Sequence, residues 1–230
     1  MAFWSAENAT KAYLKTLNMG QKANEPDVVE FISALAAGSN AQLMVVACEG
    51  AADSTTLALV AAAQQTGGRV VCVLLGDQEL HQSEVVLGLN NFCHIEFVIG
   101  EAQNLLQTHY RDADFVVIDC NLENHEGVVR AVEMGKKSKG GSGGAVVVGY
   151  NAFRRRSTWR SMGSKTQLLP IGAGLLVARI VPKKSDGDGI NNTCDGFGKR
   201  SHWVVKVDKC TGEEHVFRVR SPVHGKGIEA

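Results

Sequence analysis

The chain has 230 residues, 44% of them hydrophobic, and its 24 basic residues balance its 24 acidic residues, so that the net charge is zero. This balance provides no general attraction to nucleic acid or to an anionic membrane, no apolar run reaches bilayer-spanning length, and the N-terminus lacks a signal-peptide pattern. We therefore predict a single domain over residues 1–230 that binds neither membranes nor a specific nucleic acid. The predicted location is cytoplasmic, with a nuclear location as the alternative.

Two helices are predicted first, over residues 5–18 and from Asp27 to Gly38, because apolar residues recur there at helical spacing after a capping residue. Five short apolar runs follow, each with a helical pattern behind it. They lie at residues 43–48, 69–75, 94–99, 114–118 and 144–149. Such runs are typical of strands buried on both faces, and their alternation with helices predicts a doubly wound, parallel α/β sheet. The loops at the carboxyl ends of its strands should form the ligand crevice.

Beyond Arg160 the alternation stops. Residues 174–181, 202–207 and 214–220 are predicted to be strands, and the last two form a hairpin. A loop rich in Gly, Asp and Asn at 185–200, which we expect to be mobile, precedes this hairpin. The sheet is therefore expected to end in antiparallel strands.

Residues 43–60 combine a buried strand, a turn of small residues and a capped helix. The turn covers Glu49 to Ala52, and Asp53, Ser54 or Thr55 can cap the helix that follows. Nucleotide-type cofactors are commonly held in this way, because the turn lets backbone approach the ligand and the helix start offers free N–H groups. An ordinary strand-to-helix turn that binds nothing is the alternative, since the spaced glycines of a dinucleotide fingerprint are missing.

Four stretches resemble the caffeoyl-coenzyme A and catechol O-methyltransferase group. Asn24-Glu-Pro-Asp27 resembles its helix start before the first strand, and Asp53-Ser-Thr-Thr-Leu-Ala-Leu59 resembles its Gly-Tyr-Ser-Thr-Leu-Ala-Leu helix start. Asp114-Phe-Val-Val-Ile-Asp119 followed by Asn124 resembles its metal-strand segment. Leu169-Pro-Ile-Gly-Ala-Gly-Leu175 resembles its closing Leu-Pro-Val-Gly-Asp-Gly strand. The chain is thus similar to a plant family of methyltransferase-like proteins.

This resemblance implies a class I methyltransferase fold, Rossmann-like and seven-stranded, with a mostly parallel sheet, antiparallel C-terminal strands and S-adenosylmethionine as the cofactor. Within it, residues 1–40 would form N-terminal helices, 41–165 the core and 166–230 the antiparallel strands. The candidate cofactor-binding residues are Glu49, Gly50, Ala51, Asp53, Ser54, Gly76, Asp77, Glu101 and Ala102.

The chain departs from the family pattern at the cofactor loop. Ala47, Glu49 and Asp53 align with an acidic residue and two glycines, which puts the room for the methionine part of the cofactor in question. The alternative is that Glu49 and Gly50 restore the chemistry out of register. Leu74 aligns with the acid that takes the ribose hydroxyls. Asp77 would need a shifted loop to replace that acid, and Glu101 is the residue best placed to face adenine or ribose.

The metal-dependent chemistry of the family is not retained either. Its Asp-Ala-Asp-Lys segment becomes Asp119-Cys-Asn-Leu122, and its later Asp-Asn pair becomes Tyr150-Asn151. A hard cation needs several carboxylate oxygens, whereas one carboxylate and two amides remain. Leu122 cannot accept a proton in place of the family's lysine. We therefore predict no metal site and no magnesium-dependent catechol-type methylation.

Asp119, Asn151 and His125 are the candidate catalytic residues. Asp119 follows a buried strand beside the expected crevice, or else it caps a helix from residue 121 onward. Asn151 ends the next strand, where it could orient a substrate or simply form a turn. His125 could act as a base near neutral pH, or it could be a surface residue in the first turn of a helix.

Cysteines and basic residues receive mostly structural interpretations. The six cysteines contain no C-x-x-C pair and are predicted to be reduced core residues, although Cys120 could be a reactive thiol. A basic cluster could bind a phosphate-bearing substrate or an acidic partner, but we favour a solvated face. It comprises Lys136, Lys137, Lys139, Arg154, Arg155, Arg156 and Arg160.

Two functions follow from these observations. The first is a divergent S-adenosylmethionine-dependent methyltransferase that acts on a small molecule without a metal and relies on positioning the nucleophile. The alternative is a catalytically inactive, methyltransferase-like binding or scaffolding protein, because fold alone does not decide activity. A homodimer is left open.

Overall fold

The computed structural model describes residues 4–19, 27–88, 94–137, 144–153 and 166–181, and the strands 201–207 and 214–220. The chain divides into two compact units, residues 1–184 and 185–230. Each unit is described by itself, and the assignment of residues 1–230 to a single domain stays a prediction.

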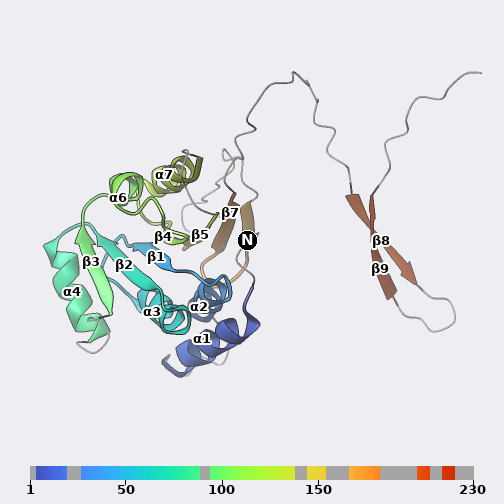
Figure 1. The fold of residues 1–230 in the computed structure, drawn as a ribbon, viewed down its shortest axis with the longest axis horizontal. Helices are drawn as coiled ribbons and strands as arrows, with labels where there is room; N and C mark the ends of the chain where they lie inside the picture. Colours follow the sequence, from blue (N-terminus) through green and yellow to red (C-terminus); the bar gives the residue numbers. More distant parts are fainter. Residues whose placement is uncertain are drawn as a thin grey trace, which may run out of the picture. The chain divides into compact units, whose positions relative to one another are not determined.

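The first unit contains a seven-stranded sheet in the order β3-β2-β1-β4-β5-β7-β6 (Figure 1). Strands β1 to β5 are parallel, and at one edge β7 pairs antiparallel with both β5 and β6. The bounds are β1 Leu43–Ala47, β2 Arg69–Leu74, β3 Ile95–Ile99, β4 Phe115–Asp119, β5 Ala145–Tyr150, β6 Thr166–Leu169 and β7 Leu175–Ile180. The predicted mostly parallel sheet with an antiparallel end is confirmed.

Helices cover both faces of this sheet, as Figure 1 shows. On one face, α1 (Ala6–Met19), α2 (Val28–Gly38) and α3 (Ser54–Thr66) pack together, and Leu87 of α4 (Asp77–Leu87) joins the same core cluster. On the other face, α6 (Ala102–Thr108) packs on α7 (His125–Lys137). None of the helices in the described ranges is long and apolar enough to cross a membrane. Because β1, β2 and β4 face helices on both sides, their side chains are apolar except at two strand ends, Arg69 at the start of β2 and Asp119 at the end of β4.

Local sequence explains where the key helices begin and end. Asp27 and Glu30 form a capping box at the start of α2. Asp53 caps α3, and Gly67 ends α3 in the left-handed conformation with a φ of 73°. These caps fix the position at which each helix meets the edge of the sheet.

The antiparallel strands differ from the sequence prediction in one respect. The seventh strand of the sheet is β6, whose four residues are too few and too exposed to give a strand pattern. The predicted strands at 202–207 and 214–220 instead form a separate two-stranded sheet, β8 (Ser201–Val207) with β9 (Glu214–Arg220). The predicted mobile loop at 185–200 lies outside the described residues.

Lys136 was predicted to belong to a solvated basic face, and the structure corrects this. Helix α7 continues to Lys137, and Lys136 is buried, with 2% of its surface exposed. Burial of its ammonium group lowers the pKa of Lys136, although Asp112 and Asp114 oppose this effect. The other predicted members of the basic cluster lie outside the described residues or have undescribed side chains, so the cluster stays a prediction.

Candidate functional site

A cavity of about 250 Å³ opens at the carboxyl ends of the parallel strands. It lies between the ends of β1, β2 and β3 and the loops that lead into α6 and α7. Its walls are mainly apolar and include Val73, Leu75, Leu122 and Val128. The cavity therefore occupies the crevice that the sequence predicted from the strand alternation.

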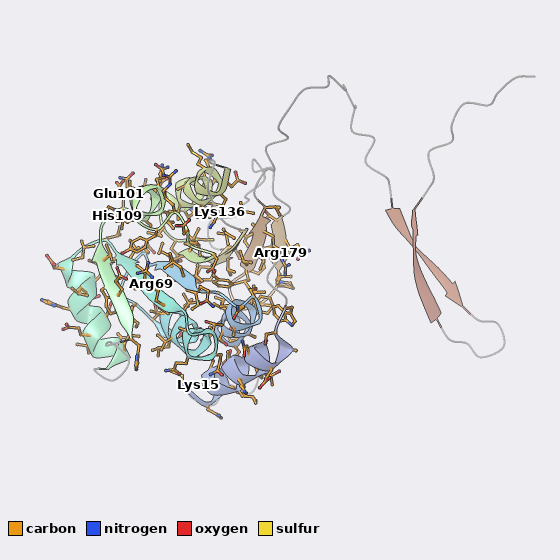
Figure 2. The ribbon with its side chains drawn as sticks, viewed as in Figure 1. Lys15, Arg69, Glu101, His109, Lys136 and Arg179 are labelled. Carbon is orange, nitrogen blue, oxygen red and sulfur yellow. The ribbon has the colours of Figure 1, made fainter. Side chains whose placement is uncertain are left out.

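Polar side chains line the cavity where α6 and α7 begin. Glu101 is an exposed residue just before α6 (Figure 2), and the Asn104 amide donates a hydrogen bond to its carboxylate at 2.9 Å. The Asn124 amide donates to Gln103 Oε1 at 2.6 Å and so connects the two helix starts. Glu123 also lines the cavity, so the site combines an apolar interior with two carboxylates and two amides, which can orient a ligand.

A second group of polar residues lies at the ends of β1, β4 and β5. We call Asp53, Asp119 and Tyr150 the acidic corner. Asp119 Oδ1 accepts hydrogen bonds from the Asn121 backbone N–H at 2.9 Å and from the Asn151 amide at 3.0 Å. Asp119 is 8% exposed. These two donors hold its carboxylate in one orientation.

Electrostatics connect the members of the acidic corner. Burial raises the pKa of Asp53, and the charge of Asp119 raises it further against the lowering effect of hydrogen bonds from Thr55 and Thr56. Burial and the neighbouring acidic groups also raise the pKa of Tyr150 well above its ordinary range, so its phenol stays neutral. Among the described residues, the corner therefore brings two acids and a neutral phenol together in a partly desolvated region.

Cys48 connects the corner to the cavity. It lines the cavity, and its thiol lies 3.8 Å from that of Cys72. The hydrogen bond with Cys72 and burial raise the pKa of Cys48, with a further contribution from Asp53. Cys48, Cys72 and Cys120 are buried with no disulfide between them, which confirms the core interpretation for these three. The remaining cysteines lie outside the described residues.

We expect Asp53→Asn to stabilise the chain at neutral pH. The raised pKa means that the folded chain retains a proton on Asp53 from about pH 3.9, the ordinary aspartate value, up to the folded-state pKa. The stability that this proton supplies is present below that window and is lost as the pH rises through it. Asparagine keeps the capping oxygen and removes the charge. The melting temperature should therefore rise at pH 7, and the gain should shrink by pH 4.

Asp27→Asn is the matched control for this variant, because Asp27 caps α2 with an exposed carboxylate. Its melting temperature should change little at either pH. An equal gain for Asp53→Asn at pH 7 and pH 4 would contradict the prediction.

The sequence matches the model of a family described as "Protein of unknown function (DUF1442)" over residues 1–219. The chain belongs to the DUF1442 family. The search of curated proteins found no match.

Solved structures of methyltransferases share the fold of this DUF1442 chain. A methyltransferase from Geobacter sulfurreducens is 19% identical with a TM-score of 0.51, covering 76% of this chain and 90% of that chain. S-adenosylhomocysteine-bound PaMTH1 from Podospora anserina is 12% identical with a TM-score of 0.54, covering 78% and 90%. A putative caffeoyl-CoA O-methyltransferase from Staphylococcus aureus is 11% identical with a TM-score of 0.52, covering 76% and 93%. These matches confirm the predicted methyltransferase-like fold, and the plant origin stays a prediction.

Among the predicted cofactor-binding residues of this DUF1442 chain, Glu101 and Ala102 line the cavity. Glu49, Gly50, Ser54 and Asp77 are exposed, Ala51 is half-buried, and Gly76 caps α4. Helix α4 begins at Asp77, directly after Gly76. Leu75 rather than Asp77 therefore lines the cavity at the end of β2. The binding roles of all these residues stay predictions.

For each of the three catalytic candidates, the sequence left a purely structural role as the alternative. Asp119 bonds to Asn121 in a turn, and α7 begins at His125, so Asp119 does not cap that helix. His125 is 8% exposed, which excludes the surface alternative; its Nδ1 lies 2.9 Å from the Leu122 carbonyl oxygen. Asn151 has a φ of 60° and donates to Asp119, so it forms the turn and also orients the carboxylate. Their catalytic roles stay predictions.

Sequence reasoning missed several residues of the cavity, among them Gln103 and Asn124. The resemblance to a metal-strand segment included Asn124, but no sequence signal paired it with Gln103. Within the described ranges, no group of three or more His, Cys, Asp or Glu side chains could hold a metal ion. This observation does not test whether the chemistry is independent of a metal, which stays a prediction.

Proposed function

We propose that this protein binds S-adenosylmethionine and transfers its methyl group to a small molecule without a metal. The observation that carries this proposal is the cavity between the starts of α6 and α7, at the carboxyl ends of a methyltransferase-like sheet. The Podospora anserina structure, which was crystallised with S-adenosylhomocysteine, shares this fold and supports the choice of cofactor. A cytoplasmic location and a small-molecule acceptor belong to the same proposal.

The residues of the cavity fit the adenosine part of this cofactor. A purine can lie between apolar walls such as Leu75 and Leu122, and ribose hydroxyls can donate to the Glu101 carboxylate. The volume of about 250 Å³ is below the roughly 300–1,000 Å³ of pockets that hold a whole drug-sized ligand. The sulfur-bearing arm would therefore extend past Cys48 toward the acidic corner.

The cofactor, when bound, supplies a methyl group activated by a sulfonium. The chain's own contribution is positioning, since Leu122 cannot act as a base. Asp119, held by Asn121 and Asn151, presents a fixed acceptor that can orient a donor group of the methyl acceptor. A substrate that is already nucleophilic needs only in-line placement against the methyl group.

Thermal melting with S-adenosylmethionine and S-adenosylhomocysteine tests cofactor binding. Ligand at a hundred times its dissociation constant should stabilise the fold by about 2.7 kcal/mol, which corresponds to a rise of several degrees in melting temperature for a chain of this size. Ala102→Phe, which fills the cavity, should abolish the rise. Ala6→Phe on the exposed surface of α1 is the control and should retain it. No rise with either ligand at millimolar concentration would refute the proposal.

A binding protein without catalysis is the second candidate, and Leu122 in place of a proton acceptor favours it. Both candidates predict cofactor binding, so the distinguishing measurement is formation of S-adenosylhomocysteine from S-adenosylmethionine in the presence of candidate nucleophiles. Binding without turnover across phenols, thiols and amines would favour this second candidate. A homodimer stays a prediction under either function.

A further inference from the structure

The hairpin of β8 and β9 is an addition to the methyltransferase-like sheet. The seven strands of that sheet all lie in the first unit, and β8 pairs with β9 in a sheet of their own (Figure 1). The family match extends over residues 1–219 and so includes the hairpin up to the next-to-last residue of β9. The hairpin is therefore a feature of this family that the seven-stranded sheet does not require.

The hairpin has fewer strands than a stable sheet needs. A single two-stranded hairpin is at best marginally stable in water, and three or more strands with an apolar face are needed for independent stability. Among the described residues, β8 and β9 pair only with each other, so each strand has one edge without a ladder partner. A further strand at one of these edges would stabilise the hairpin.

The sequence of β9 is complementary to itself in an antiparallel alignment. When Phe217 lies opposite its counterpart in a second copy, all seven residues of β9 have a partner. Glu214 then lies opposite Arg220 of the second copy, and the two-fold axis repeats this pair at the other end. Within the hairpin, Glu214 instead lies opposite Val207, and Arg220 opposite Ser201. The alignment therefore supplies two opposite-charge pairs, which stabilise an antiparallel ladder.

Other two-fold alignments of these strands are less favourable. Strand β8 aligned about Val204 places His202 opposite Lys206 and forms no pair of opposite charges. An alignment of β9 centred one residue earlier pairs residues 214–218 alone, and one centred on Arg218 places two like charges opposite each other. Charge and strand length together favour the alignment about Phe217.

We propose that the β9 edges of two copies pair antiparallel and join the chains into a homodimer. The resulting sheet has four strands, two from each copy. Val204 and Phe217 are direct partners in the hairpin, so these two residues and their counterparts form one apolar row across all four strands. Strand β8 becomes the outer edge, where Lys206 opposes further pairing. This inference is independent of the proposed function, because it concerns the second unit only.

Sedimentation velocity of the full chain over a series of concentrations measures the dissociation constant of this dimer. Glu214→Arg and Arg220→Glu each place like charges opposite each other at both ends of the β9 ladder. Each should raise the dissociation constant by about tenfold or more. An equimolar mixture of the two variants restores opposite charges at both ends, so it should dimerise as tightly as the unmodified chain. A folding defect in either variant would not produce this rescue.

Lys206→Glu is the matched control, because it reverses a charge on β8 of the same hairpin. It should leave the dissociation constant unchanged. The double variant Glu214→Arg with Arg220→Glu is again self-complementary and should dimerise like the unmodified chain. The proposal would be overturned by an unmodified chain that stays monomeric at every concentration, or by an unchanged dissociation constant in both single variants. Weakening that neither the mixture nor the double variant reverses would overturn it as well.

Discussion

Phe115→Ala is expected to destabilise the chain by about 3–5 kcal/mol. Among the described residues, Phe115 is the largest fully buried side chain, with none of its surface exposed. It lies on β4, where Met44 of β1 and Val146 of β5 are its neighbours in the sheet. The backbone hydrogen bonds on both sides prevent these strands from closing the space that alanine would leave. Most of the free-energy cost of the cavity that alanine leaves should therefore appear as a loss in the free energy of unfolding.

Chemical denaturation of the full chain, followed by far-ultraviolet circular dichroism, measures this loss. Phe115→Leu is the matched control and should cost less than about 1.5 kcal/mol, because it preserves most of the apolar volume. A loss below about 1 kcal/mol for Phe115→Ala would show that the sheet relaxes around the vacancy.

Gly68→Ala is expected to destabilise the chain by about 3 kcal/mol, the upper end of the usual cost of overpacking. A Cβ at residue 68 would lie 2.6 Å from the Ala41 carbonyl oxygen and 2.9 Å from that of Gln42. Both contacts are to backbone, which cannot rotate away as a side chain can. The Gln42 carbonyl also accepts a hydrogen bond from the Arg69 N–H at 2.9 Å. The substitution must therefore separate the chain before β1 from the start of β2.

Gly50→Ala provides the control for this prediction, because a Cβ at Gly50 has no atom within 4 Å. It should be almost neutral in the same denaturation experiment. Similar stabilities for the two variants would mean that the segment before β1 shifts freely, contrary to the expectation.

The sequence predicted the parallel part of the sheet because β1, β2, β4 and β5 are apolar along their length, apart from Arg69 and Asp119 at strand ends. Burial on both faces leaves little choice of residue type, so these strands can be recognised from their apolar runs in the sequence. The strand β6 has no such constraint, since two of its four residues are exposed at the edge of the sheet. Its pairing with β7 depends on the turn between them, which the apolar pattern does not encode.

The candidate site was predictable only where it adjoins a strand end. Glu101 follows β3 almost directly, so its place in the crevice followed from the topology. The bridge between Gln103 and Asn124 joins residues 21 positions apart, and it depends on the packing of α6 against α7. Burial of His125 likewise depends on the residue at which α7 begins, which sequence patterns locate poorly.

The cap of α3 has a consequence for how this family can diversify. Aspartate and asparagine codons differ by a single nucleotide, and both residues cap a helix. One mutation at position 53 can therefore remove a charge at the start of α3 while the strand, the turn and the helix stay in place. The charge at this position can thus change by drift while α3 keeps its cap.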